Sequence, residues 1–593
     1  SQQLSMLNGN TPSNDKTDPL SNAMSPVKQE ISLREALSRQ NGAQEISHGN
    51  VRHTPDSPVD SNHDEKQAFH LFKPVRSNDN VKRKDEELTY LQEFVPRYTK
   101  RTQESKRLAQ KFRPVLADVR SSLGFRMAWK ELVYPLSISR ASGSKVWDVD
   151  GNEYVDLVMG FGVHLLGHSP VCVMDALAEQ LGEQPQFVGP QPNKAGEVAQ
   201  LITEFTGTER VTFCNTGSEA VMTAIRLARS VTGKSKIAVF EESYHGNFDS
   251  VLVRRSERKG QRKVVPVSLG IPPSSVQEIV VLDYDNADSL EFLRKHADEF
   301  AAVLVEPIQS RCPDLQPKDF LHELRTLTKE RGIVLIFDEM ITGFRLDQGG
   351  AQAWFNVKAD LVTYGKVVGG GMPIGIVSGK AEIMDAIDGG MWEFENDSFP
   401  QADQTFFAGT FCKHPLALAA SYAVLSYLKK QGPSLQQGLN QRATDFVKQL
   451  NVLFNDAGVP IEVKNCGSMF LFNHSSEIQS IDLLLYNLME KGVSLFGDRP
   501  YFLSTAHTKE DLEYILDAVQ RSVKELQKGN LLPSFSKHTD TWSANAVHMD
   551  FAQMASSASS GMGPRNNDAE TSTSKPDVPE AILPSTGQKL QKK

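Results

Sequence analysis

The sequence predicts an α/β protein: a large domain with a mainly parallel sheet, and a smaller α+β domain. Three patterns support this prediction. Short β-rich apolar runs alternate with helical patterns through the middle of the chain, as expected when helices cover both faces of a parallel sheet. Helical patterns with a few strands dominate from about Pro415 to Gln527, and polar segments without periodicity lie at both ends.

The elements follow in order along the chain. A charged pattern with Leu88, Leu91 and Phe94 on one face predicts a helical segment to about Ser122, and alternation on either side of an Asp-Gly pair predicts a hairpin over 144–157. The central pattern predicts strands at 211–214, 236–240, 301–305, 333–337 and 361–363, with helices starting near Ser218 and spanning 319–329.

These patterns divide the chain into linkers and folded parts. The predicted parts are a disordered linker (1–85), a helical leader (86–123), the first part of the small domain (124–190), the large domain (191–410), the second part of the small domain (411–530) and a second disordered linker (531–593). The linker-like ends suggest a segment of a longer polypeptide. A processed protein with long polar ends explains them equally well.

Composition excludes several classes of function. A net charge of −9 argues against nucleic acid as the main partner. Five dispersed cysteines indicate neither a disulfide framework nor a zinc site and suit a reducing, cytoplasmic location. No apolar run approaches the roughly 20 residues that span a bilayer, so we expect a soluble protein without a membrane partner.

Ligands in open α/β sheets bind at the carboxyl ends of the strands. In this chain, two of the turns that follow strands contain candidate ligand-binding residues. After the strand at 211–214, Gly217 and Ser218 begin a helix and are candidates for a phosphate cup, because free N–H groups at a helix start bind anions. A plain helix cap is the alternative. After the strand at 236–240, Tyr244 and His245 precede Gly246, so the tyrosine ring is a candidate cover for a flat ring, with ordinary packing as the alternative.

Two further strand ends carry charged residues. Asp338 ends an apolar strand, so its carboxylate needs a cation or a donor, either a protonated pyridine nitrogen or a structural salt bridge. Lys366 follows the strand at 361–363 among apolar and glycine neighbours. Desolvation lowers the pKa of such an amine and suits it to nucleophilic and base chemistry, whereas most lysines are merely solvated. Together the four sites supply what a pyridoxal 5'-phosphate enzyme requires.

From about Arg126 to Gln527 the chain resembles the class III, fold-type I aminotransferases, and within them the glutamate-1-semialdehyde aminomutases. The matching motifs are Asp148 to Gly151, Asn215 to Ala220, Tyr244 to Gly246, Asp338 to Arg345, and Gly365-Lys366. The resemblance implies pyridoxal 5'-phosphate as the cofactor and a homodimer as the assembly.

The resemblance also implies residue roles. Lys366 becomes the lysine that binds the cofactor and moves protons, and Asp338 the partner of its pyridine nitrogen. Gly217 and Ser218 become phosphate ligands, and Tyr244 a neighbour of the ring. The remaining implied positions are His245 and Met340 beside the cofactor, Thr410 reaching the cofactor phosphate of the partner subunit, and Arg126, Phe161 and Glu339 on the substrate. Met340 departs from the usual valine, and the segment 388–405 looks enlarged.

The leader and the linkers make the chain more similar to the aminotransferase domains of hybrid polyketide/nonribosomal-peptide synthases. That resemblance implies transfer of an amino group from an amino-acid donor to a β-keto acyl chain bound to an acyl carrier protein, with other megasynthase domains as neighbours. A basic run, Arg254 to Lys263, is expected to be a loop that either docks the carrier or is simply solvated.

Other functions stay open at this point. They are a true aminomutase, a racemase or decarboxylase on the same fold, and a catalytically silent scaffold domain of a megasynthase. His164 and His168 have a spacing found in zinc sites, but they flank a predicted turn and have no evident third ligand, so we interpret them as structural.

Overall fold

The structure is a computed structural model that describes residues 85–123, 125–183, 188–258, 261–474, 481–497 and 499–533. The two predicted linkers, 1–85 and 531–593, lie almost wholly outside the described residues. Within the described residues, no helix is both long and apolar enough to cross a bilayer.

A seven-stranded sheet forms the centre of the large domain. Its strands, in spatial order, are β4 (Arg210–Cys214), β12 (Gly375–Gly379), β11 (Leu361–Gly365), β10 (Val334–Asp338), β9 (Phe300–Val305), β5 (Lys236–Phe240) and β8 (Ile279–Leu282). β12 runs antiparallel to both of its neighbours, and every other pairing is parallel. β9, β10 and β11 are buried along their whole length, which explains their unbroken apolar sequences. The predicted mainly parallel sheet is confirmed.

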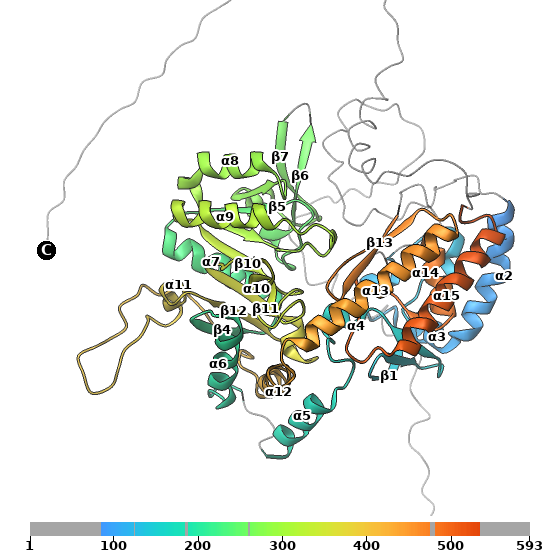
Figure 1. The fold of residues 1–593 in the computed structure, drawn as a ribbon, viewed down its shortest axis with the longest axis horizontal. Helices are drawn as coiled ribbons and strands as arrows, with labels where there is room; N and C mark the ends of the chain where they lie inside the picture. The colour runs from blue at the N-terminus through green and yellow to red at the C-terminus, as the bar shows by residue number, and fades with distance from the viewer. Residues whose placement is uncertain are drawn as a thin grey trace, which may run out of the picture. The chain divides into compact units, whose positions relative to one another are not determined.

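Helices connect these strands and lie on the sheet (Figure 1). They are α6 (Lys194–Thr206), α7 (Gly217–Thr232), α8 (Ala287–Lys295), α9 (Lys318–Arg331), α10 (Gly350–Phe355) and α11 (Ala381–Met384). α7 begins where Thr216 accepts a hydrogen bond from the N–H of Glu219, and it ends at Gly233 in the left-handed region. The predicted strands and helices of this domain are confirmed to within a few residues.

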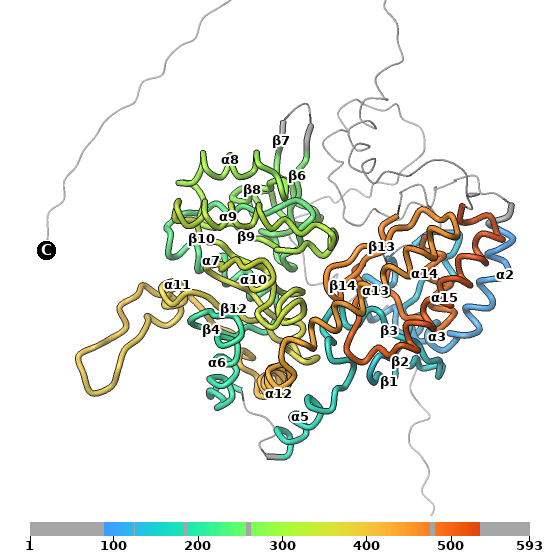
Figure 2. The backbone as a smooth tube through the Cα atoms, in the orientation of Figure 1, coloured from blue at the N-terminus to red at the C-terminus, as the bar shows by residue number. Residues whose placement is uncertain are grey.

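A smaller domain combines segments from before and after the large sheet. One of its sheets contains β1 (Ile138–Ser142), β2 (Lys145–Asp148), β3 (Glu153–Asp156) and β15 (Val493–Ser494); the other contains β13 (Ile461–Cys466), β14 (Met469–His474) and β16 (Tyr501–Phe502). Its later helices are α13 (Ser434–Asp456), α14 (Ile481–Glu490) and α15 (Lys509–Lys528). β2 and β3 form the predicted hairpin. The parallel pairing of β15 with β3 joins the two segments, and Figure 2 shows β3 in the same part of the molecule as α14 and α15.

Two helices lie between these parts in the sequence. α5 (Val171–Glu183) precedes the large sheet, and α12 (Pro415–Gln431) follows it. α12 packs against α5, against α6 and against the turn that follows β11. Short helical turns complete the described chain: η2 (Val119–Ser121), η3 (Met127–Leu132), α4 (Met159–Gly162), η4 (Asp249–Val251), η5 (Pro273–Val276), η6 (Ala297–Glu299), η7 (Lys366–Gly369) and η8 (Asp385–Ile387).

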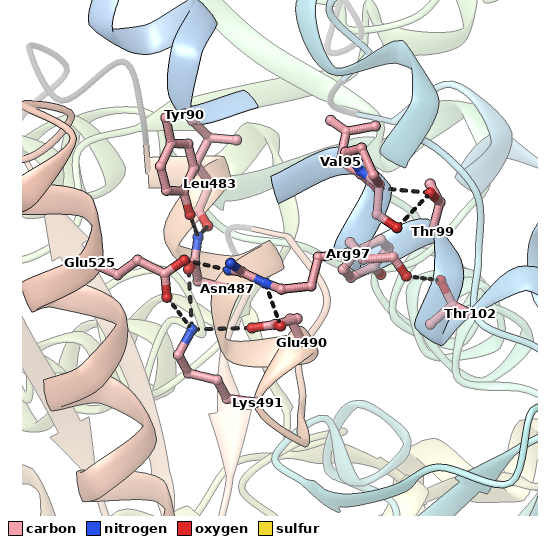
Figure 3. A network of polar contacts seen from close by, with 12 residues as sticks. Tyr90, Val95, Arg97, Thr99, Thr102, Leu483, Asn487, Glu490, Lys491 and Glu525 are labelled. Atoms are coloured by element: carbon pink, nitrogen blue, oxygen red, sulfur yellow. Dashed lines mark hydrogen bonds and ion pairs between the residues drawn. The ribbon is translucent and has the colours of Figure 1, made fainter. Parts of the chain in front are cut away.

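The leader forms two helices, α2 (Asp85–Arg101) and α3 (Gln103–Phe112), and packs into the small domain. Arg97 forms ion pairs with Glu490 of α14 and Glu525 of α15, and Asn487 donates to the hydroxyl of Tyr90 (Figure 3). The predicted continuation of the helix to Ser122 is wrong. α3 ends two residues before Pro114, because proline has no N–H to continue the hydrogen bonds of the helix.

The expectation of a loop at the basic run is also wrong. β6 (Val253–Arg258) pairs antiparallel with β7 (Gln261–Pro266) to form a two-stranded hairpin. The many charged residues leave no clear alternation of apolar and polar residues here, and that alternation is the sequence signal that predicts a strand.

Candidate active site

Four strand ends converge where the sequence places its candidate residues, and the first of them forms a small concave cup. Gly217 and Ser218 begin α7, whose first N–H groups lack partners within the helix. A Cβ atom at Gly217 would lie 2.7 Å from Sδ of Met340, and one at Gly246 would lie 2.7 Å from Oγ of Ser218. Gly246 has a φ of +110°, and the N–H of Asn247 donates to Oγ of Ser218 at 2.9 Å. The cup therefore depends on close backbone approach, which only glycine permits.

Asp338, the last residue of β10, is buried with an exposed fraction of 3%. One carboxylate oxygen contacts Nδ1 of His245 at 2.9 Å, and the other accepts from the hydroxyl of Thr363 and the N–H of Met340. Nε2 of His245 is buried and has no hydrogen-bond partner in the described part of the chain. Buried polar atoms normally have partners, so this nitrogen marks the place where a bound group would supply one.

Lys366 follows β11 directly, with a strained φ of +45°. Burial lowers the pKa of its amine; the nearby carboxylates of Asp338 and Glu306 act in the opposite direction, and the guanidinium of Arg345 adds to the lowering. No hydrogen bond or ion pair engages the amine within the described ranges. The amine is thus free and less basic than an ordinary lysine, as a nucleophile requires.

The sequence reasoning missed Glu306, which follows the wholly buried strand β9. Its carboxylate accepts from the N–H of Tyr244 at 3.2 Å and from the N–H of Ser310 at 3.0 Å, and burial raises its pKa. The signal was present, because an acidic residue after an apolar strand is the pattern that identified Asp338. Glu306 holds the backbone of Tyr244, whose ring keeps 53% of its surface exposed and is accessible for stacking.

Glu339 points its carboxylate into the fold. The carboxylate accepts from the N–H groups of Ala351 and Gln352, at 2.5 and 3.1 Å, and from the hydroxyl of Thr342 at 3.1 Å. The side chain is completely buried, which raises its pKa to about 7. These three donors account for Glu339 as a cap of α10, and its predicted substrate contact stays a prediction.

Phe161 and Arg126, the other predicted substrate residues, lie in the small domain. Phe161 has a φ of +56°, and its ring meets that of Phe496 edge to face at 5.4 Å. The guanidinium of Arg126 stacks over the ring of Trp129 at 4.9 Å and lies 3.7 Å from the carboxylate of Asp482. Both side chains are partly exposed, so both remain accessible to a ligand.

Thr410 lies near the end of an extended segment between α11 and α12, drawn in gold in Figure 1. The threonine is exposed, and this segment carries several large apolar side chains that are also exposed: Met391, Trp392, Phe394, Phe399, Phe406 and Phe411. A Cβ at the preceding residue, Gly409, would lie 3.6 Å from Nδ2 of Asn215 in the turn before α7, and the predicted contact of Thr410 with the phosphate of the partner subunit stays a prediction.

The residues that converge fit pyridoxal 5'-phosphate. A helix start with a serine and close glycines suits a phosphate, a buried carboxylate suits a pyridinium, and a desolvated amine suits the aldehyde carbon. The described residues contain no group of three side chains able to hold a metal ion. Fold and site together define a pyridoxal-phosphate-dependent transferase of fold type I.

The chain belongs to the class III aminotransferase family, whose model matches residues 127–523. It is 35% identical over 408 residues to glutamate-1-semialdehyde 2,1-aminomutase of Persephonella marina, covering 66% of this chain and 92% of that one. The same enzyme of Archaeoglobus fulgidus is 36% identical over 406 residues, covering 66% and 93%. The predictions of class III membership, of the cofactor and of aminomutase-like sequence are confirmed.

Solved structures agree with this assignment. An omega-transaminase from Sphaerobacter thermophilus superposes with a TM-score of 0.64 at 29% identity, covering 71% of this chain and 98% of that one. A β-phenylalanine aminotransferase from Variovorax paradoxus gives a TM-score of 0.63 at 26% identity, covering 76% and 100%. The resemblance to synthase-embedded domains stays a prediction.

Proposed function

We propose that this protein is an aminotransferase that takes the amino group of an amino-acid donor and delivers it to the keto carbon of a β-keto acyl chain. The observation that carries the proposal is the free, buried amine of Lys366 beside the Asp338–His245 pair and the cup at the start of α7. Transamination needs a group that binds the cofactor, moves a proton and keeps a pyridinium charged.

Each chain residue has a defined task in this proposal. The cofactor, when bound, supplies an electron sink for the pair left at the carbon that loses its proton. Gly217 and Ser218 would bind its phosphate through N–H groups and a hydroxyl, and Asp338 would keep its ring nitrogen protonated. His245 fixes the orientation of the Asp338 carboxylate. Lys366, whose pKa is lowered by burial, is the group that would bind the cofactor and take the α-proton of the donor.

Two features support a β-keto acceptor. The structural relative from Variovorax paradoxus acts, by its name, on an amino acid whose amine is at the β-carbon. The resemblance to the aminomutases implies that Phe161 takes the place of their tryptophan, and we infer that the pocket wall differs at that point. Presentation of the acceptor on an acyl carrier protein belongs to the proposal, supported by the linker-like composition of 1–85 and 531–593. The basic hairpin β6–β7 is then the surface that docks an acidic carrier.

A homodimer belongs to the same proposal. The exposed apolar side chains of the segment between α11 and α12 are what an interface would cover, and Thr410 lies among them. In a symmetric dimer this segment reaches the partner, and Thr410 contacts the phosphate bound by the partner subunit.

A second function has its own support. Identity of 35% over 92% of an aminomutase favours movement of nitrogen within one substrate, without an external donor. The two functions differ in one observable: an aminotransferase releases a 2-oxo acid from its donor, whereas an aminomutase does not.

The deciding experiment is the absorbance spectrum of the cofactor-loaded protein before and after addition of L-glutamate, L-glutamine and other amino acids. Loss of the lysine-bound band with release of an equal amount of 2-oxo acid supports the aminotransferase. A band that no amino acid discharges, with turnover of glutamate 1-semialdehyde, supports the aminomutase. If Lys366→Ala retained the band, the assignment of Lys366 would be wrong.

A further inference from the structure

The small domain contains a cavity of about 390 Å³ beside Phe161. Its walls come from η2 and the chain after it, from the strands β1 to β3, from the turn containing Phe161, and from α14 with the residues that follow it. The lining residues used below are Ala141, Val146, Leu485, Met489, Leu495 and Phe496. Part of the wall, Arg120 and Leu123, precedes the residues that match the family.

The cavity wall is mainly apolar. Val146, Leu485 and Leu495 are buried core residues that also face this space. The charged groups of its wall have partners: Asp156 contacts Nε2 of His168 at 2.8 Å, Arg120 pairs with Asp118 at 2.7 Å, and Asp482 lies 3.7 Å from Arg126. A ligand here would meet hydrocarbon without leaving a charge unpaired, which favours an apolar guest.

Phe161 belongs both to the wall of this cavity and to the residues predicted to contact the substrate. Gly160 and Phe161 line the cavity, and Phe161 is the residue predicted to face the substrate. The next residue, Gly162, accepts a hydrogen bond at 2.6 Å from the guanidinium of Arg345, which lies a few residues after Asp338. The turn that borders the cavity is therefore held by the same segment that carries the pyridine partner.

We propose that this cavity binds the hydrocarbon part of the amino acceptor, which makes the acceptor an acyl chain of limited length. The inference rests on the proposed function and adds to it the substrate class. Small-molecule pockets measure roughly 300 to 1,000 Å³, so a cavity of about 390 Å³ lies near the lower limit and suits a medium rather than a long chain.

The test uses the cofactor-loaded enzyme, amino-loaded by its best donor, and a series of β-keto acyl thioesters of N-acetylcysteamine from butanoyl to tetradecanoyl. Each buried methylene contributes about 0.8 kcal/mol, so kcat/KM is expected to rise by roughly fourfold per methylene until the cavity is full, and then to level off. A kcat/KM that does not change with chain length would overturn the proposal.

Two variants test whether the acyl chain of the acceptor binds in this cavity. Ala141→Phe fills the cavity and should move the plateau to shorter chains, whereas Met489→Ala enlarges it and should move the plateau to longer ones. Ala178→Phe, on the exposed face of α5, is the matched control and should keep the wild-type profile. Each profile is normalised to the variant's own rate of donor discharge. If the wild type and all variants gave the same dependence of kcat/KM on chain length, the acyl chain would bind outside this cavity.

Direct binding separates failure of this inference from failure of the proposed function. Calorimetric titration of the loaded enzyme with decanoate needs no turnover, so it reports on the cavity even if no amino acid discharges the enzyme. Binding that Ala141→Phe weakens at least tenfold and Ala178→Phe does not supports the cavity in either case. Absence of saturable binding by decanoate and by the longer thioesters would overturn the inference and leave the aminotransferase assignment intact.

Discussion

Gly246→Ala is expected to weaken cofactor binding without unfolding the protein. The new Cβ would lie 2.7 Å from Oγ, 3.0 Å from Cα and 3.1 Å from Cβ of Ser218, so the first turn of α7 must move and not only a flexible side chain. A non-glycine residue at a φ of +110° adds local strain of about 1 to 3 kcal/mol.

The expected loss of affinity follows from what this movement breaks. Displacing Ser218 removes one charge-assisted hydrogen bond to the phosphate, which contributes about 1.5 to 3 kcal/mol. Cofactor affinity should therefore fall by roughly 10- to 150-fold. Titration of the cofactor-free variant with pyridoxal 5'-phosphate, followed by absorbance, measures the dissociation constant, and thermal unfolding of the cofactor-free protein measures the cost to the fold.

Gly438→Ala is the matched control. Gly438 lies in the exposed face of α13, and a Cβ there meets nothing within 4 Å. That change should leave cofactor affinity as it is and stabilise the helix by about 0.5 to 1 kcal/mol. A Gly246→Ala variant that binds the cofactor as tightly as Gly438→Ala would refute the assignment of the cup as the phosphate site.

Three further outcomes are expected. Lys366→Ala should abolish the lysine-bound absorbance band and turnover while keeping the thermal midpoint, and Lys430→Ala, at the exposed end of α12, should keep all three. Burial lowers the pKa of His164 from 6.5 to about 4, so between these pH values the folded state binds fewer protons than the unfolded state. The free energy of unfolding should therefore fall as the pH drops from 6.5 to 4. It should fall less in His164→Gln, which has no group that titrates there. Arg345→Met should shift the pH midpoint of the lysine-bound band upward, since it removes a positive charge that lowers the pKa of Lys366; an unchanged midpoint would contradict this coupling.

The large domain could be predicted closely because its strands are buried on both faces. β9, β10 and β11 appear in the sequence as continuous apolar runs, and each ends at or just before a charged residue. The end of the leader and the basic hairpin could not be predicted as well. At the leader, Pro114 overrides a periodic pattern, and in the hairpin the strand pairing leaves no apolar stripe for the sequence to reveal.

The candidate site shows the same division. Asp338 and Lys366 could be predicted from the sequence because burying a charged residue in an apolar run is costly unless the residue has a partner or a function. Glu306 met that criterion and was overlooked. The role of Arg345 could not have been found, since its contacts come from Gly162, Ser468 and Leu503, which are distant in the sequence.

Arg345 both contacts the small domain and affects the pKa of the Lys366 amine. Its guanidinium is completely buried, and its hydrogen bonds go to two backbone carbonyls and a serine hydroxyl; no carboxylate pairs with it in the described residues. Desolvation lowers its pKa to about 9, so it still carries a positive charge near neutral pH. That charge disfavours protonation of Lys366, while its hydrogen bonds hold the turn next to Phe161 and two segments of the small domain. The hydrogen bonds of Arg345 to the small domain therefore keep its charge buried, and burial strengthens the effect of that charge on the amine because water does not screen it.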